Sequence, residues 1–501
     1  MTAGPGGRRQ PSPRGLDAVE CTQPDTPDRR IRTIALASGL LTTAIGFVGI
    51  GRPSLWYDEA ASSSAAARPL DTIPALLRDV DVVHGLYYVL LHGWCHVFGT
   101  SAVALRSPSA IALGVACAGC VVLAHHLGGR TVALVAGGTF ALLPGLAWSA
   151  TEAREWSSAT AVVTWATVAL VYAVGADRRR WWVGYAALMV VAITLSVMTV
   201  LMAGPHLWLA RRTGRLRQAV LAVASAVVVT LPLLHEAFTQ RGQVAWIQLS
   251  PVQVAVRVVT TQLFAADQNH GYPHELLVGT VLAGVSVVAG LAGLAARRPG
   301  AGLGAVWFTV PTVLLAVPVV LGVQLYQDRY LTFAAPGAVL LVAEGVVALH
   351  HRTTGRAGLR TLAACGVLLA IVAAVTALAA QRDPSAKAGD DYRTLAAAAR
   401  GADQVFYERA DARGIRLAYP DDLVGVQDVL LTGDPAATGT LWGTERAGDP
   451  VRPEGVVVTY VFTVEPRGSR ARLVPFLRDD GCSLEDRHVA ARWTALRWSC
   501  P

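Results

Sequence analysis

Long apolar stretches recur along the first three quarters of the chain, separated by short polar segments. The first runs from Ile34 to Gly51 and is long enough to cross a bilayer at about 1.5 Å of rise per residue. Further stretches predict membrane-spanning helices at residues 105–126, 131–150, 157–175, 182–196, 197–210, 217–235, 276–296, 303–322, 330–349 and 359–380. The pattern therefore predicts a mainly α-helical, polytopic membrane protein with about eleven transmembrane helices.

The two ends of the chain lack this pattern. Residues 1–30 are rich in Pro, Gly, Arg and Asp, which predicts a disordered tail. Beyond Ala380 the composition becomes polar, and one helical and two strand patterns follow, at residues 391–400, 403–408 and 455–464. The sequence thus predicts a transmembrane domain at 31–380 and a small α/β domain at 381–501.

Clusters of arginine give the chain an orientation. If the N-terminus is cytoplasmic, the basic loops all fall on the cytoplasmic side, at residues 125–130, 178–180, 211–217, 297–298 and 352–360. This agrees with the excess of Lys and Arg in cytoplasmic loops of membrane proteins. We therefore expect a multi-pass protein of the cytoplasmic membrane, with outer loops at 52–104 and 236–275 and an extracytoplasmic C-terminal domain.

The segment 85–98 is apolar but has too few residues for an ordinary span. Counting it as a span would place most of the later arginine clusters outside. We therefore assign it to the outer loop 52–104 as a helix that lies in the membrane interface.

Composition adds two constraints. Hydrophobic residues make up 53% and charged residues 16% of the chain, and the net charge of +8 arises in the membrane part, so it does not indicate nucleic-acid binding. The C-terminal domain contains two cysteines, Cys482 and Cys500. An extracytoplasmic location predicts a disulfide between them.

The first candidate for chemistry is the pair Asp58 and Glu59, in the sequence LWYDEA just outside the first span. Such carboxylates can take a proton from an acceptor hydroxyl. Asp58 could instead hold a divalent metal ion such as Mg, Mn or Ca. The alternative is an ordinary solvated start of a loop.

Other charged residues fall on the same outer face. Glu152 and Arg154 lie in a very short loop, Arg329 and Tyr330 open a late span, and Arg106 opens the second; Asp267 and His270 are weaker candidates in the large outer loop. An arginine at the outer end of a span needs an anionic partner, and a lipid phosphate held by two hydrogen bonds would serve. Each group could also be a plain polar turn, an ion pair within the protein or an interfacial side chain.

In order, these segments resemble the GT-C superfamily of polyprenyl-phosphate-sugar-dependent glycosyltransferases. The likeness is strongest to the branch of protein O-mannosyltransferases and aminoarabinose transferases, in its actinobacterial type. It rests on the acidic pair, the segment HGLYYVLLHGWCHVFG followed by ALRSPSA, the loop TEARE and the late RYL.

The resemblance implies a role for each candidate. Asp58, with Glu59 beside it, would be the catalytic carboxylate. Arg329, Tyr330 and Arg106 would bind the donor phosphate, and Glu152, Arg154 and His84 would lie on the acceptor and sugar side. The implied reaction transfers a sugar, mannose or arabinofuranose by analogy, from a polyprenyl phosphate to an envelope glycan, lipid or protein.

Two other functions fit a polytopic protein. A transporter or flippase of lipid-linked envelope precursors would carry charges near the middle of the bilayer, whereas most predicted span interiors here lack them. A non-catalytic assembly partner would not require the acidic pair.

Overall fold

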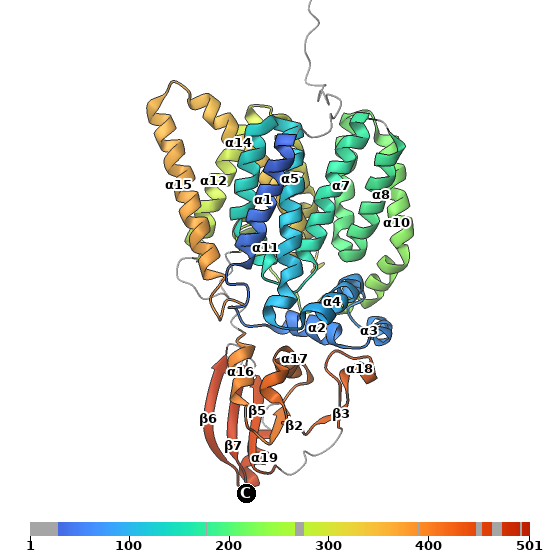
Figure 1. The fold of residues 1–501 in the computed structure, drawn as a ribbon, viewed down its shortest axis with the longest axis vertical. Coiled ribbons are helices and arrows are strands. Elements are labelled where there is room, and N and C mark those ends of the chain that lie inside the picture. The colour runs from blue at the N-terminus through green and yellow to red at the C-terminus, as the bar shows by residue number, and fades with distance from the viewer. Residues whose placement is uncertain are drawn as a thin grey trace, which may run out of the picture.

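The computed structural model describes residues 29–501 except 177, 266–274, 388–389, 447–452, 463–472 and 491–492. A bundle of long helices forms one part of the molecule, and a smaller α/β domain adjoins one end of the bundle (Figure 1). Of the predicted tail 1–30, residues 1–28 lie outside the described residues, and Arg29 begins the first helix.

The bundle contains helices long and apolar enough to cross a membrane; by these two criteria alone, the described residues include seven. Apolar side chains on the outside of such helices face lipid at little cost, whereas backbone polar groups are satisfied within each helix. The principal helices are α1 (Arg29–Phe47), α5 (Ala102–Leu142), α7 (Trp156–Ala176), α8 (Arg179–Leu195), α9 (Ala203–Arg212), α10 (Leu216–Thr239), α12 (Glu275–Ala295), α13 (Pro299–Val320), α14 (Ala335–Thr353) and α15 (Ala357–Ala380). The predicted mainly α membrane fold with an α/β domain is confirmed, without fixing the number of spans.

Element α5 contains the predicted spans 105–126 and 131–150 as two helices that meet at a kink at Gly129, whose φ is 84°. The two helices pack against each other, since Sγ of Cys117 lies 3.9 Å from the carbonyl oxygen of Gly137. Glycine lacks a Cβ and adopts this left-handed conformation without the usual steric cost. A short helix, α6 (Pro144–Ala150), then completes the third predicted span, 131–150.

The outer loop 52–104 is mostly helical. It contains α2 (Tyr57–Ala67), α3 (Ile73–Asp79) and α4 (Gly85–Phe98). These helices lie at the end of the bundle that faces the α/β domain (Figure 1). The large outer loop contributes α11 (Pro251–Thr260), which begins with a capping box between Ser250 and Gln253.

The α/β domain is built on a five-stranded mixed sheet with the order β2-β1-β5-β7-β6. The central strand β5 (Val456–Phe462) pairs in parallel with β1 (Gln404–Tyr407) and antiparallel with β7 (Trp493–Ser499). The edge strands are β2 (Gln427–Asp428) and β6 (Ser483–Ala490). A disulfide joins Cys482 to Cys500, next to the paired ends of β6 and β7.

The α/β domain holds α2 through backbone carbonyls. Ser63 donates to the Leu417 carbonyl at 3.1 Å, Ser64 to that of Leu441 at 2.9 Å, and Arg68 to that of Thr440 at 3.0 Å. The partners of α2 therefore include α17 (Gly414–Ala418) and the loop before β4 (Thr444–Glu445). The helix that carries the acidic pair thus packs against both parts of the molecule.

Candidate active site at one end of the helical bundle

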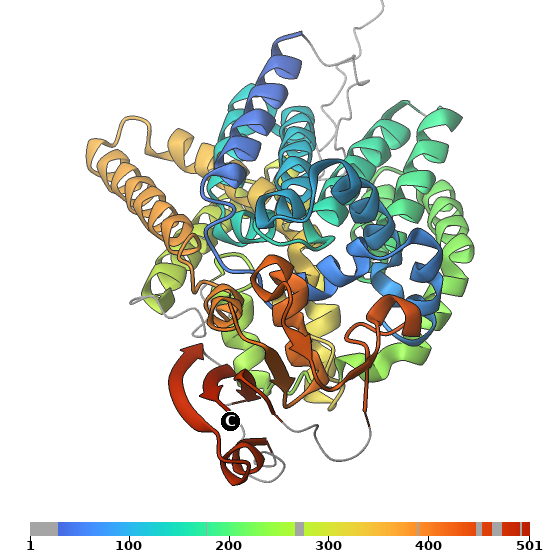
Figure 2. The same ribbon diagram turned by 60° about the horizontal axis from the view of Figure 1, so that its bottom comes forward.

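A cavity of about 1080 Å³ opens where the bundle, the outer loops and the α/β domain meet. Its wall includes residues from α2, from the loop between α6 and α7, from α11 and from the segment that precedes α14. Figure 2, which brings this end of the molecule forward, shows these elements beside the α/β domain. Segments far apart in the sequence therefore line one cavity.

Asp58 lies in the first turn of α2 and lines this cavity. Its Oδ1 is 3.5 Å from Nη2 of Arg154, and its Oδ2 is 3.1 Å from Nη2 of Arg329. The side chain is 15% exposed, and the N-terminus of α2 adds partial positive charge near it. Asp58 is thus held between two guanidinium groups.

Arg329 and Tyr330 lie in a 3₁₀ turn, Asp328–Ala334, directly before α14. The Arg329 guanidinium lies over the rings of Trp56 and Trp246, at 5.3 and 5.7 Å from their centroids. Its Nε has no hydrogen-bond partner among the described residues. Arg329 lines the cavity, and its side chain is 19% exposed, so its guanidinium can meet an anionic ligand there.

Arg154 lies in the short loop between α6 and α7. Besides Asp58, it contacts the hydroxyl of Tyr88, 3.2 Å from its Nη1, and Tyr88 donates to Asp81 at 2.6 Å. Tyr88 is buried on α4. Helix α4 therefore holds Arg154 against Asp58.

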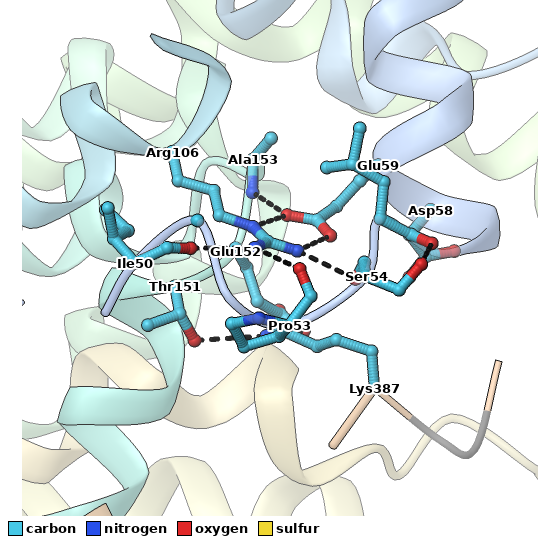
Figure 3. Close-up of polar contacts among 12 residues, drawn as sticks. Ile50, Pro53, Ser54, Asp58, Glu59, Arg106, Thr151, Glu152, Ala153 and Lys387 are labelled. Carbon is cyan, nitrogen blue, oxygen red and sulfur yellow. Dashed lines mark hydrogen bonds and ion pairs between the residues drawn. The ribbon is translucent and has the colours of Figure 1, made fainter. Parts of the chain in front are cut away.

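The contacts of Arg106 and Glu59 in the structure contradict the roles predicted for them. Both side chains are fully buried, and Arg106 contacts both Glu59 carboxylate oxygens at 2.6 Å (Figure 3). Its other N–H groups donate to the carbonyls of Ile50, Pro53 and Ser54. All five donors of this guanidinium are thus used within the protein. Arg106 has none left for a phosphate, and Glu59 closes a structural ion pair.

Glu152 lines the cavity but is paired with a residue that the sequence did not indicate. Nζ of Lys387 lies 3.5 Å from Glu152 Oε1, and both side chains are buried. Burial raises the pKa of Glu152, although Lys387 and Arg329 oppose the shift. The charged form of this carboxyl is therefore less favoured than that of an exposed glutamate.

His84 also reaches the cavity wall. Its Nδ1 lies 3.0 Å from Oε2 of Glu155, and its ring packs against Tyr88 and Trp156. Tyr330 contacts Trp156 from the other side, with ring centroids 5.3 Å apart. Asp267 and His270 lie outside the described residues.

Comparisons with known proteins bear on this architecture. No protein-family model matches the sequence, and no curated protein matches it. Among solved structures, apo ArnT from Cupriavidus metallidurans is similar over 93% of this chain and 97% of its own, with a TM-score of 0.59 and 13% identity. ArnT bound to undecaprenyl phosphate gives the same coverage and identity with a TM-score of 0.57.

The chain has a GT-C-like fold. Oligosaccharyltransferase from Archaeoglobus fulgidus, tethered to an acceptor peptide, is more distant, with a TM-score of 0.47 and 10% identity over 83% of this chain and 64% of its own. At these identities the likeness concerns the fold.

Sequence reasoning missed two partners of residues that line the cavity of this GT-C-like fold. Arg257 of α11 pairs with Asp328 at 2.7 Å, and both line the cavity. Lys387 follows α15 and pairs with Glu152, and it could have been noticed because it is the only lysine of the chain. The two pairings could not be found without the three-dimensional arrangement.

A metal ion at Asp58 does not fit the residues that the structure describes. Both oxygens of this carboxylate face arginine nitrogens, and no group of three or more His, Cys, Asp or Glu side chains converges in the described part of the chain. Mg²⁺ and Ca²⁺ are held by several oxygen ligands. At this place in the GT-C-like fold, positive charge is instead supplied by guanidinium groups.

Proposed function

We propose that the chain is a membrane glycosyltransferase that transfers a sugar from a polyprenyl phosphate to an acceptor on the extracytoplasmic face. The observation that carries this proposal is the placement of Asp58 between Arg154 and Arg329 on one large cavity. The similar structure of ArnT with undecaprenyl phosphate supports a lipid phosphate as the donor.

The proposed chemistry follows from the charges. An acceptor hydroxyl attacks the anomeric carbon, the bond from that carbon to the phosphate oxygen breaks, and the polyprenyl phosphate leaves with the electron pair. Arg329, with Tyr330 beside it, stabilises the charge that develops on this phosphate, because fixed cations in a partly dry site act strongly. Asp58 is the catalytic carboxylate, which takes the proton that the acceptor hydroxyl loses, and Glu152, Arg154 and His84 line the acceptor and sugar side. Protein side chains supply each of these roles.

Our proposal extends to the substrates. A mannose or arabinofuranose donor and an envelope glycan, lipid or protein acceptor fit the resemblance to actinobacterial enzymes. The location would be the cytoplasmic membrane, with the α/β domain outside, where an acceptor of the cell envelope can reach the cavity.

The test is transfer by the purified protein in lipid nanodiscs. Labelled polyprenyl-phosphate mannose and arabinofuranose are incubated with envelope extract, and labelled products are counted. We expect Asp58→Asn to lower the rate by about 100-fold or more, as for a lost catalytic carboxylate. Asp421→Asn, on the exposed surface of the α/β domain, is the matched control and should keep the wild-type rate.

Two results would contradict the proposal. A wild-type protein that moves labelled lipid across vesicles without forming a product would be a transporter. An Asp58→Asn protein that transfers sugar at the full rate would exclude catalysis by this carboxylate.

A further inference from the structure

Lys387 occupies an unusual place for a lysine. It lies in the linker between α15 and α16 (Tyr392–Ala398), beyond the last long helix, and its side chain is fully buried. Removing an ammonium group from water is costly unless fixed partners replace the water. Apart from the histidines, every other basic side chain of the protein is an arginine. The buried Lys387 therefore indicates that this position requires a compact cation.

The partners of Lys387 come from one short segment. Its Nζ donates to Thr151 Oγ1 at 3.1 Å and lies 3.5 Å from Glu152 Oε1, as Figure 3 shows. The ammonium also lies 3.8 Å from the centroid of the Trp148 ring, a cation–π contact. A single cation from the linker therefore fixes the loop between α6 and α7.

The two oxygens of Glu152 are in different situations. Oε1 faces Lys387, whereas Oε2 is buried and has no hydrogen-bond partner among the described residues. Glu152 is among the residues that line the cavity. A buried carboxylate oxygen without a hydrogen-bond donor is unfavourable. A hydrogen bond from a ligand hydroxyl to Oε2 would therefore be favourable.

We propose that Lys387 is a positioning residue that holds one oxygen of Glu152 and leaves the other to accept a hydrogen bond from a hydroxyl of the acceptor. This inference rests on the proposed function and deepens it. It places the acceptor hydroxyls at the Glu152 side of the cavity, and the donor phosphate at Arg329.

The pairing can be measured without any assay of transfer. Burial lowers the pKa of Lys387 to about 8; Glu152 and Glu59 raise it against this effect, and Arg106 and Arg382 lower it further. Because the chain has one lysine, protein labelled with ¹³C at lysine Cε gives one side-chain NMR signal to titrate. We expect Glu152→Gln to move this titration to lower pH, since a charge that favours the ammonium is removed.

Steady-state kinetics test the role in binding. We expect Lys387→Gln and Glu152→Gln each to raise the KM for the acceptor about tenfold, the size of one charge-assisted hydrogen bond. The KM for the donor should stay unchanged. The double variant should be no worse than Glu152→Gln alone, because both changes remove the same interaction.

The matched control is Arg393→Gln. Arg393 also ties the start of the α/β domain to the bundle, by donating to the carbonyls of Gly51 and Arg52, and it is not among the residues that line the cavity. Its loss should lower the unfolding temperature without changing the KM for the acceptor.

Each contrary result has a distinct meaning. The inference is overturned if Lys387→Gln lowers only the unfolding temperature, if both KM values rise together, or if the lysine titration is unchanged by Glu152→Gln. If the wild-type protein transfers no sugar, the proposed function fails and the acceptor role with it, even where the NMR coupling is seen.

Discussion

At the scale of the residue, the arginines predicted to lie on the outer face differ in whether all their N–H donors have hydrogen-bond partners within the protein. Arg106 uses every donor on Glu59 and three backbone carbonyls, whereas Arg329 keeps its Nε without a partner among the described residues. A guanidinium with no donor to spare stabilises the fold, and one with a donor facing a cavity can bind a ligand. The two arginines therefore have separate roles.

Replacing each arginine by methionine should separate these roles. Arg106→Met leaves Glu59 buried without its partner, so we expect a loss of about 3–5 kcal/mol in the free energy of unfolding. Arg329→Met faces a cavity that water can fill, so we expect a smaller loss of stability and a strongly reduced affinity for the lipid donor. Thermal unfolding in detergent and donor binding measure the two effects. Equal unfolding temperatures in both variants would argue against the distinction.

The sequence could predict part of this site. Sidedness alone predicted that Asp58, Arg154, Arg329 and Tyr330 share one face, and the structure brings them to one cavity. It could not separate Asp58 from Glu59, because consecutive residues of a helix point about 100° apart and no pattern located the start of α2.

At the scale of the element, the apolar pattern predicted where helices lie better than where they end. The predicted spans 105–126 and 131–150 are two helices that meet at Gly129, and the second is interrupted before Pro144, where α6 begins. Hydrophobicity reports only that a segment can be buried in lipid. Where a helix is interrupted depends on backbone angles, and the positive φ of Gly129 marks the kink between the two spans.

Substitution of Gly129 by alanine tests this kink. An added Cβ would meet no atom within 4 Å, so Gly129→Ala should cost only the strain of its positive φ, about 1–3 kcal/mol of unfolding free energy. Gly138, in the helix that follows the kink, also has open space around it but no positive φ. Gly138→Ala should therefore be neutral or slightly stabilising. Thermal unfolding of both variants checks this, and identical shifts would contradict the kink.

At the scale of the whole molecule, charge is divided between the two ends of the bundle. The cavity with its acidic and arginine side chains adjoins the α/β domain, and the N-terminal helix begins at the opposite end (Figure 1). The arginine-rich loops that set the predicted orientation are joined to the same helices. If the N-terminus is cytoplasmic, as the arginine clusters predict, the cavity at the other end of the bundle faces the outside.

Fusions with alkaline phosphatase, which is active only outside the cytoplasm, test this orientation. We expect activity for fusions after Pro501 and after Thr239, which ends α10. A fusion after Arg298, in a predicted cytoplasmic loop, should be inactive and serves as the control. An active Arg298 fusion paired with an inactive Pro501 fusion would invert the topology, because helices cross the bilayer in alternating directions.

Three hydrogen bonds tie Ser63, Ser64 and Arg68 of α2 to the α/β domain. This has a consequence for building chimaeras. The acceptors are backbone carbonyls, so an α/β domain taken from a related protein would keep these contacts only where its loops follow the same path. A functional hybrid therefore needs residues 57–68 from the same parent as the domain wherever those loops differ.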